Sequence, residues 1–504
     1  MTREPVEQAG KGLHPSADHA LRARTARGAA LEVAKRLSCI ATNMVATAML
    51  ARILEPADFG RMAMVLLLVS LVTQFETGLM TASLQSHGMS RRDLTRLIWL
   101  STSTGACLAA LTAAMAPAID ASLGRPGIAG LAAATGTAFI FSGACVHLRA
   151  LLLREMRFDS IARIDVISTI CGAAATVIAA RSGLGCWALA MWPVVTSAFT
   201  LAMTLGETRR IPTVAPGPLD GRRVRSIYRF ACSLFAFNLG SYVIRNADNF
   251  VVGRVLGPAA LGLYSKAYGA VAFPVLQFST PISQALTPAL IKRRNDPQRF
   301  REGYLDAVSG LASLGFPAAA AMVVFADLII MLLLGPKWGD CTLLVRLLAP
   351  AAILGAVNVS AGWLCTPFGR NRRMVIWASF AAPLFACCYW VGSRWGLEGV
   401  AVAMSTCWCI MFPILVLMAS GPSPVRFVDW ARVVAPPYAY TLLASLLAML
   451  FRESSWARSN VAIDIAGGAC VFLAAYASPM LLFPHGRESL RGGIALLMLV
   501  RGAK

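Results

Sequence analysis

Two ionisable side chains, Arg245 and Asp248, stand three residues apart inside an otherwise apolar part of the chain. They open the segment RNADNFVVGRVLGPAALG, which covers residues 245–262. At bilayer depth an ionisable side chain costs at least about 2.5–3.5 kcal/mol on insertion scales, so each should face a partner or a hydrated cavity. Residues three apart share one face of a helix. The two side chains therefore either neutralise each other as a buried pair, or Arg245 binds an anionic ligand group and Asp248 orients it.

Other polar residues in apolar segments extend this candidate site. Lys266 and Arg346 could add positive charge to a central cavity, although Lys266 could instead snorkel to the membrane interface. Asn43 and Asn238 could hydrogen-bond to a polar ligand, or simply tie neighbouring helices together. Glu76 is the acidic residue deepest in an apolar segment. It is the candidate for proton or cation coupling, with a hydrogen-bonded structural carboxylate as the alternative.

The composition indicates that membrane-spanning helices must position these residues. Apolar residues make up 57% of the 504, charged residues only 14%, and mean hydropathy is +0.64; a soluble domain carries about 25% charged residues. Apolar runs of about 20 residues, long enough to cross a bilayer, recur along the chain. We predict an all-α polytopic membrane protein with about 14 transmembrane helices, centred near residues 42, 72, 106, 138, 170, 195, 241, 272, 318, 353, 381, 408, 440 and 471.

The formal net charge of +21 does not indicate nucleic-acid binding. The basic residues lie in short clusters between apolar runs, which is the pattern of topology signals and of attraction to anionic lipid. The clusters fall mainly on the even-numbered connections, so both termini are expected on the cytoplasmic side. Examples are Arg91, Arg92 and Arg96, then Arg222, Arg223 and Arg225, and then Lys292, Arg293 and Arg294.

No motif typical of an enzyme or of a metal site occurs in the sequence. Most of the 13 cysteines lie in apolar segments, where a thiol behaves as a small hydrophobe. Their spacing matches neither a metal-ligand set nor a disulfide framework. The 5 histidines form no zinc-binding motif, and nucleophile-elbow and P-loop motifs are absent. We expect no catalytic residue, no cofactor and no metal.

A repeated pattern divides the chain into two similar parts. Residues 51–60 read ARILEPADFG and residues 253–262 read GRVLGPAALG, with Arg, Leu, Pro, Ala and Gly at matching places. A second echo joins GLGCWALAM at 183–191 to GLEGVAVAM at 396–404. Each repeat should contain an even number of spans, so the halves enter the membrane the same way round, as in parallel-repeat transporters.

These patterns predict two six-helix bundles followed by a helix pair. A polar connection rich in Pro, Gly and Arg separates the bundles, as a linker should. The expected organisation is a disordered cytoplasmic tail at 1–28, an N-terminal six-helix bundle at 29–206, a cytoplasmic linker at 207–225, a C-terminal six-helix bundle at 226–420, two additional transmembrane helices at 421–484 and a cytoplasmic tail at 485–504.

Two stretches resemble a known family. The first, ARILEPADFGRMAMVLLLVSLVTQFETGLMTASLQ, is similar to the first two helices of bacterial polysaccharide-biosynthesis flippases in the multidrug/oligosaccharidyl-lipid/polysaccharide exporter superfamily, chiefly in its R-x-L-x-P-x-x-F/Y-G element. The second runs from FAFNLG to LTPAL and looks like the seventh and eighth helices of the exopolysaccharide and colanic-acid branch. Its RN-x-DN, G-x-x-LG and LG-x-Y-x-x-A-Y elements carry that likeness.

The resemblance implies a function that the residue patterns alone do not give. Such a protein would move undecaprenyl-pyrophosphate-linked oligosaccharide units from the cytoplasmic to the periplasmic leaflet of the bacterial inner membrane. The units would serve exopolysaccharide, lipopolysaccharide or capsule biosynthesis. By the same resemblance, its partners would be the lipid-linked glycan, membrane lipids, and a polymerase and a chain-length regulator of the same pathway.

Two other functions are compatible with a chain of this kind. A drug or cation antiporter of the same superfamily shares the architecture, but it would favour acidic residues in the cavity, whereas Arg245 is prominent here. A membrane polysaccharide polymerase would be expected to carry large periplasmic loops. Every odd-numbered loop of this sequence looks short.

Overall fold

The protein is described here by a computed structural model that defines residues 15–85, 91–123, 127–208, 221–370, 372–421, 423–455, 460–483 and 486–487. The regular secondary structure of these residues is helical throughout. The helices before the central connection are α1 (Pro15–Ile53), α2 (Pro56–Gln85), α3 (Arg91–Leu123), α4 (Ile128–Gly136), α5 (Ala138–Arg154), α6 (Phe158–Arg181) and α7 (Cys186–Thr208).

The chain after the central connection is also helical. They are α8 (Gly221–Val251), the π-helical turn η1 (Val252–Leu256), α9 (Pro258–Arg293), α10 (Pro297–Val324), α11 (Ala326–Leu333), the 3-10 turn η2 (Pro336–Trp338), α12 (Cys341–Gly355), α13 (Val359–Cys365), the turn η3 (Thr366–Phe368), α14 (Arg372–Gly392), the turn η4 (Ser393–Trp395), α15 (Gly396–Ser420), α16 (Phe427–Glu453) and α18 (Val461–Leu482).

The all-α polytopic fold is confirmed. Ten helical stretches of the described chain are long and apolar enough to cross a membrane, and one of them, Arg372–Ser420, contains both α14 and α15. The count of fourteen spans stays a prediction. Many large apolar side chains point outward, including Phe380 at 74% exposed and Leu473 at 63%. Lipid, which is as apolar as these side chains, would cover them.

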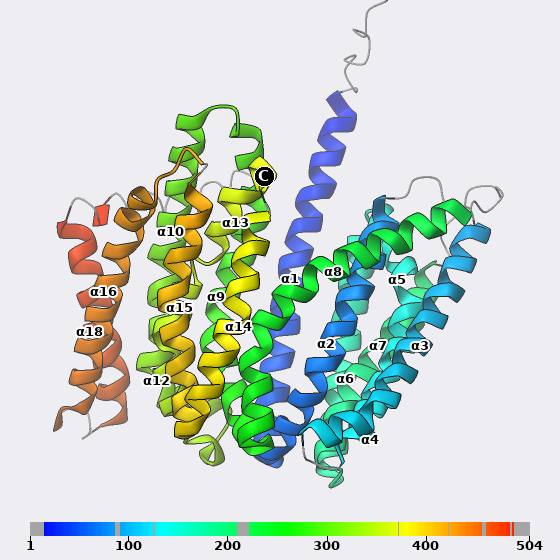
Figure 1. The fold of residues 1–504 in the computed structure, drawn as a ribbon, viewed down its shortest axis with the longest axis horizontal. Coiled ribbons are helices and arrows are strands. Elements are labelled where there is room, and N and C mark those ends of the chain that lie inside the picture. Colours follow the sequence, from blue (N-terminus) through cyan, green and yellow to red (C-terminus); the bar gives the residue numbers. More distant parts are fainter. Residues whose placement is uncertain are drawn as a thin grey trace, which may run out of the picture.

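The helices form two halves and an attached pair (Figure 1). Helices α1–α7 pack on one another as the N-terminal half, and α9–α15 do so as the C-terminal half. Helices α16 and α18, the attached pair, pack on each other, and α16 packs on α10 at the outer edge of the C-terminal half. The segment expected to be a disordered tail is helical from Pro15, where α1 begins. The expected tail at 485–504 lies almost entirely outside the described residues.

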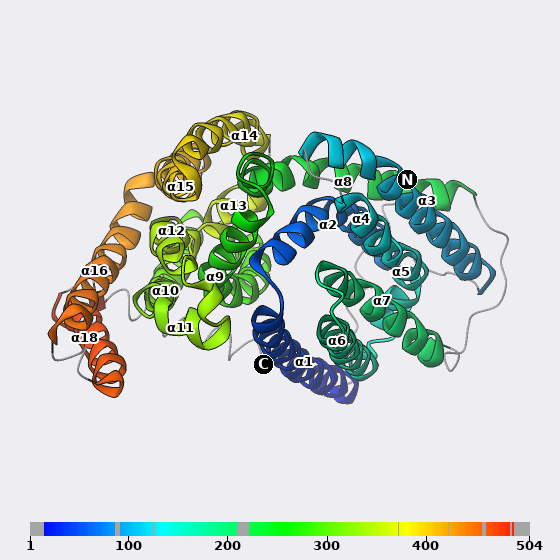
Figure 2. The ribbon, with the colours of Figure 1, turned by 90° about the horizontal axis from the view of Figure 1, so that it is seen from below.

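Helix α8 belongs to both halves. Its first part lies over α2 and α3, where the Tyr228 hydroxyl lies 3.1 Å from Thr104 Oγ1 and Ala231 is fully buried. Its last part packs against α14 and leads into η1. Figure 2 shows α8 running from the C-terminal half across the edge of α2 towards α3. The helix that carries Arg245 and Asp248 therefore links the halves.

The two halves come together at one end and spread apart at the other. The starts of α2 and α9, just after the turns at residues 54–55 and 257, pack against each other, and in Figure 1 α1 and α9 diverge from there towards the N-terminal end of α1. Each of these turns is followed by a proline at the start of a helix, Pro56 in α2 and Pro258 in α9. Proline suits this position because its missing N–H has no partner in the first helical turn. In both copies a proline thus opens the second helix, although the π-helical turn η1 precedes this junction only in the second copy.

Candidate functional site

The last turns of α8 place Arg245 and Asp248 in different surroundings. Arg245 is exposed, whereas Asp248 is only 3% exposed. The Asp248 carboxylate accepts a hydrogen bond of 2.9 Å from the hydroxyl of Tyr264 in α9, which is completely buried. The other oxygen, Oδ1, is buried and accepts no hydrogen bond from another side chain of the described residues. Burial of the carboxylate is therefore supported by a tyrosine, and the guanidinium of Arg245 stays accessible.

Two more helices, α14 and α15, complete the cluster around Asp248. The Tyr264 hydroxyl also lies 2.9 Å from the sulfur of Met404 in α15. Tyr268, one helical turn beyond Tyr264, interacts electrostatically with both Arg245 and Asp248. Tyr389 of α14 is 1% exposed and interacts with Asp248 in the same way. We call Asp248, Tyr264, Tyr268, Tyr389 and Met404 the Asp248 cluster; Arg245 lies at its rim.

Of the Asp248 cluster, only Asp248 was predicted from the sequence as a site residue; Tyr264, Tyr268, Tyr389 and Met404 were not. Tyr389 carries a hydroxyl in the middle of the apolar segment CCYWVG, and that was a usable signal. Met404 has no polar group that would mark it. It was placed within the second echo of the repeat, GLEGVAVAM, and its contact with Tyr264 depends on how α15 packs beside α9.

The two asparagines occupy different halves of the molecule. Asn238 lies in α8 seven residues before Arg245, which puts both backbone positions on one side of the helix; its side chain is outside the described part. Asn43 lies in α1 of the N-terminal half and lines a cavity of 410 Å³. The structure therefore does not bring Asn43 together with Arg245.

An ion-pair network lines the cavity next to Asn43. Asp165 of α6 accepts two hydrogen bonds from the Arg149 guanidinium, at 2.6 and 3.1 Å. Lys35 of α1 lies 3.3 Å from the same carboxylate and 2.6 Å from Glu32. Two planar N–H···O contacts make Arg149 and Asp165 a geometrically specific pair. Both carboxylates of this cavity, Glu32 and Asp165, are thus paired with cations inside the N-terminal half.

Glu76 lies in an adjoining cavity of the same half. That cavity has a volume of 360 Å³ and shares Arg149, Thr196 and Thr200 with the first one. The Glu76 carboxylate accepts a hydrogen bond of 2.6 Å from the Ser142 hydroxyl. Hydroxyl side chains dominate the polar part of the lining, namely Thr73, Thr77, Ser142, Thr196, Ser197 and Thr200. A carboxylate held by a hydroxyl can take up a proton without breaking an ion pair.

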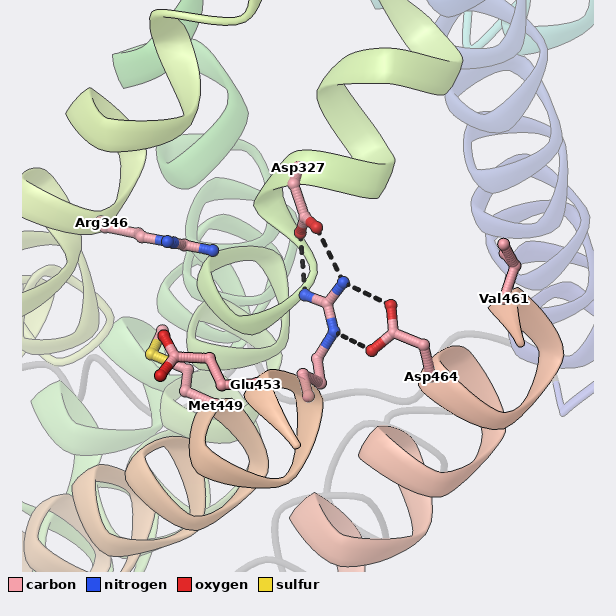
Figure 3. Close-up of a pocket in the computed structure, with 7 residues that line it drawn as sticks. Asp327, Arg346, Met449, Glu453, Val461 and Asp464 are labelled. Carbon is pink, nitrogen blue, oxygen red and sulfur yellow. Dashed lines mark hydrogen bonds and ion pairs between the residues drawn. The ribbon is translucent and has the colours of Figure 1, made fainter. Parts of the chain in front are cut away.

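Lys266 and Arg346 each have neighbours away from the Asp248 cluster. The Lys266 ammonium lies 4.2 Å from the ring centroid of Phe59, which belongs to α2 of the N-terminal half. Arg346 of α12 lines a cavity of 310 Å³ between the C-terminal half and the attached pair. Figure 3 shows Arg346 on the opposite side of this cavity from Asp464. The structure does not gather the predicted cationic residues at one place.

The centre of the Arg346 cavity is an arginine clamp. Arg452 of α16 makes contacts of 2.8 Å to both oxygens of Asp327 in α11 and to both oxygens of Asp464 in α18. Its side chain is 9% exposed. The dashed lines of Figure 3 mark these contacts. The charged groups here join the attached pair to the C-terminal half. Within the described residues, no group of three or more His, Cys, Asp or Glu could hold a metal ion.

Comparisons with known proteins agree with this architecture. A family model described as "Polysaccharide biosynthesis protein" matches residues 49–343. This range includes both copies of the repeated sequence, at 51–60 and 253–262, and the hydrogen-bonded pair Asp248 and Tyr264. The lipopolysaccharide biosynthesis protein WzxC of Escherichia coli K12 is 26% identical over 350 residues, 68% of this chain and 70% of WzxC. The succinoglycan biosynthesis transport protein ExoT of Rhizobium meliloti is 22% identical over 324 residues, 64% of this chain and 65% of ExoT.

A solved structure shows the same fold. The lipid II flippase MurJ in an inward closed conformation superposes with a TM-score of 0.67 at 13% identity. The superposition covers 90% of this chain and 98% of MurJ. The arrangement of two halves and an attached helix pair is therefore that of a known membrane fold.

Proposed function

The chain belongs to the polysaccharide biosynthesis protein family, and on that premise we propose that it is a flippase for lipid-linked oligosaccharides. It would move undecaprenyl-pyrophosphate-linked units from the cytoplasmic to the periplasmic leaflet of the bacterial inner membrane. The observation that carries the proposal is the family match across more than half of the chain, with relatives named for lipopolysaccharide biosynthesis and succinoglycan transport. The fold, shared with a lipid II flippase, supports transport rather than catalysis.

We place the cytoplasmic side at the end where α1 begins. The turn between α5 and α6 lies at this end, since Lys35 and Arg149 both contact Asp165 close to it. That turn carries Arg154 and Arg157. Basic residues concentrate on the cytoplasmic side of membrane proteins. The spread end of the two halves then opens to the cytoplasm, and both termini lie there.

The transport step requires no covalent chemistry. The polyprenyl tail would stay in the bilayer while the headgroup passes between the two halves, which alternate in opening towards each side. The exposed guanidinium of Arg245 would hold the pyrophosphate by charge-assisted hydrogen bonds. Asp248 and Tyr264 would support it by tying α8 to α9. Asn238 on the same side of α8, and Asn43 in the opposite half, would contact sugar hydroxyls.

Glu76 is our candidate for the residue that binds the coupling ion. Two adjoining cavities lead from Glu32 and Lys35 past Arg149 to its carboxylate. The hydroxyl of Ser142 is its hydrogen-bond donor. We propose that Glu76 binds a proton in one conformation and releases it in the other. Proton binding that drives transport would then take place in the N-terminal half, at a site separate from the substrate contacts of α8.

The units delivered to the periplasm would be joined by a separate polymerase, and a chain-length regulator would set the length of the polymer.

Deletion of the gene tests the proposed function. We expect loss of surface polysaccharide and build-up of lipid-linked units in the cytoplasmic leaflet, both reversed by a plasmid copy. If the deletion leaves surface polysaccharide unchanged and no lipid-linked unit builds up, the protein is not this flippase.

A further inference from the structure

The two copies of the repeated sequence touch each other reciprocally. A Cβ atom built on Gly60 would lie 1.7 Å from the carbonyl oxygen of Pro258, and one built on Gly262 would lie 1.9 Å from that of Pro56. Pro56 and Pro258 hold the same place in ARILEPADFG and GRVLGPAALG, and so do Gly60 and Gly262. Each copy therefore presents its glycine to the other copy's proline carbonyl. We call these four residues the repeat contact.

The repeat contact depends on the absence of a side chain at two positions. A real Cβ atom is essentially never found within 3.0 Å of another heavy atom, so any other residue at 60 or 262 would push two backbones apart. Small residues allow membrane helices to approach this closely, and Cα–H···O contacts add to the attraction. The obstacle at both positions is a carbonyl group of a helix start, which is not a flexible side chain that could turn aside.

Hydrogen bonds between the halves surround the repeat contact. The buried indole of Trp338 donates to the carbonyl of Ala51 at 3.0 Å. Arg52 donates to the carbonyl of Leu332 at 3.0 Å. In each case the last turn of α1 is joined to the C-terminal half, at the end of α11 or at the η2 turn that follows it. The contact between the halves thus extends beyond the two glycines.

Charged and aromatic groups cover the same region. Lys337 forms an ion pair of 2.7 Å with Glu55 on the exposed side. The Lys266 ammonium lies over Phe59, and Phe59 meets Trp338 edge to face at 5.3 Å between ring centroids. Every one of these pairs takes one residue from the N-terminal half and one from the C-terminal half. All of them lie at the end where the halves converge (Figure 1).

We propose that the repeat contact is the closure of the transporter at its periplasmic end, and that Gly60 and Gly262 are the residues that permit this closure. The proposal rests on the alternating-access function given above. When the halves open at this end, the two glycines separate from the two prolines and the surrounding pairs break. Because the contacts are reciprocal, loss of either glycine acts on the same closure. The single and double variants should therefore behave alike.

Cross-linking measures the closure directly. Glu55→Cys and Lys337→Cys replace the exposed ion pair with two thiols, which a short bis-maleimide can join. The linked peptide is quantified by mass spectrometry, so native cysteines elsewhere do not interfere. Adding Gly60→Ala, Gly262→Ala or both should lower the linked fraction about tenfold, as expected when a closed state loses most of its population. An unchanged linked fraction in the Gly60→Ala protein overturns the proposal.

Gly269→Ala is the matched control. Gly269 lies in α9, as Gly262 does, but it is exposed and a Cβ built there meets no atom within 4 Å. The linked fraction should equal that of the parent. A drop as large as that of Gly262→Ala would show that alanine in α9 acts on the helix and not on the contact, and would refute the proposal.

A second measurement avoids dependence on the glycine variants. The double-cysteine protein should export polysaccharide before cross-linking and stop when its closed end is locked. A cleavable bis-maleimide should restore export on cleavage. Full export by the locked protein would show that the halves need not separate at this end during transport. That result would contradict the proposed closure and would leave the flippase function intact. Failure of the unlocked protein and of the wild type alike would instead count against the proposed function.

Discussion

Lys266 of α9 holds its ammonium 4.2 Å from the ring centroid of Phe59 in α2, so a cation of one half rests on an aromatic ring of the other. Arginine or lysine over an aromatic face is attracted by the ring quadrupole. The contact lies beside the repeat contact and not at the rim of the Asp248 cluster. Lys266 is thus positioned to stabilise the closed end, and Arg245 is the exposed cation next to the Asp248 cluster.

The Tyr264 hydroxyl should stabilise the buried carboxylate of Asp248. Tyr264→Phe removes the one side-chain hydrogen bond that the Asp248 carboxylate accepts within the described residues. A buried polar group left without a partner costs about 1–3 kcal/mol. We expect a lower Tm in detergent micelles for Tyr264→Phe. Tyr440→Phe is the control, since the Tyr440 ring stacks on Phe483 and should lose little without its hydroxyl. Equal Tm values for both variants would contradict the assignment.

The Arg452 clamp should require the planar fork of arginine. Lysine has a single ammonium and cannot bind two carboxylates through parallel pairs of N–H groups. We expect Arg452→Lys to destabilise the attached pair by about 2 kcal/mol, below the value for a fully buried pair because the Asp327 side chain is 43% exposed. Hydrogen exchange in α16 and α18 should accelerate. Arg432→Lys, an exposed change in the same helix, should leave exchange unaltered; a similar acceleration there would exclude the clamp as the cause.

Arg245 should act on transport and not on folding. Its side chain is exposed, so Arg245→Ala should be produced in the membrane at the wild-type level. Removal of one partner of a charge-assisted contact with pyrophosphate should lower export by about tenfold or more. Arg245→Lys keeps the charge but loses the bidentate geometry, so it should restore export only in part. Undiminished export by Arg245→Ala, measured as surface polysaccharide in the deletion strain, would remove this residue from the substrate site.

Glu76 should determine how transport responds to a proton gradient. Glu76→Gln can still accept the Ser142 hydrogen bond but cannot take up a proton. We expect proteoliposomes with this variant to move substrate at a rate that no longer changes when a pH gradient is imposed. Asp58→Asn, which alters an ion-paired acid at the start of α2, should keep the gradient response. A normal response in Glu76→Gln would assign coupling to another residue.

Sequence patterns predicted the features that depend on local composition. Apolar runs predicted the helices, and the matching decapeptides at 51–60 and 253–262 indicated a repeat, in each copy of which a proline starts a helix. The location of Asp248 in a buried position followed from its place in an apolar segment. These inferences need only residue type and spacing.

Contacts between distant helices could not be predicted in the same way. Lys266 and Phe59 are separated by more than two hundred residues, and nothing in either segment indicates the other. Arg452 lies in a helix end that reads as an ordinary basic terminus, yet it binds carboxylates from two other helices. Spacing along α8 brought Arg245 and Asp248 to one helix face, but it could not indicate Tyr264, whose hydroxyl reaches the carboxylate from α9. Packing of the helices decides such pairs, and spacing along one helix does not.

The most direct test of the flippase function measures substrate movement between leaflets. Lipid-linked glycan extracted from the deletion strain is labelled with a fluorophore on its sugar and reconstituted into vesicles with the purified protein. A membrane-impermeant quencher then reports the fraction of label that reaches the outer leaflet over time. We predict that quenching proceeds to nearly all of the label with wild-type protein and stops at the outer-leaflet fraction with the cross-linked Glu55→Cys/Lys337→Cys protein. Quenching that stops at the outer-leaflet fraction with wild-type protein, as in protein-free vesicles, would contradict the account.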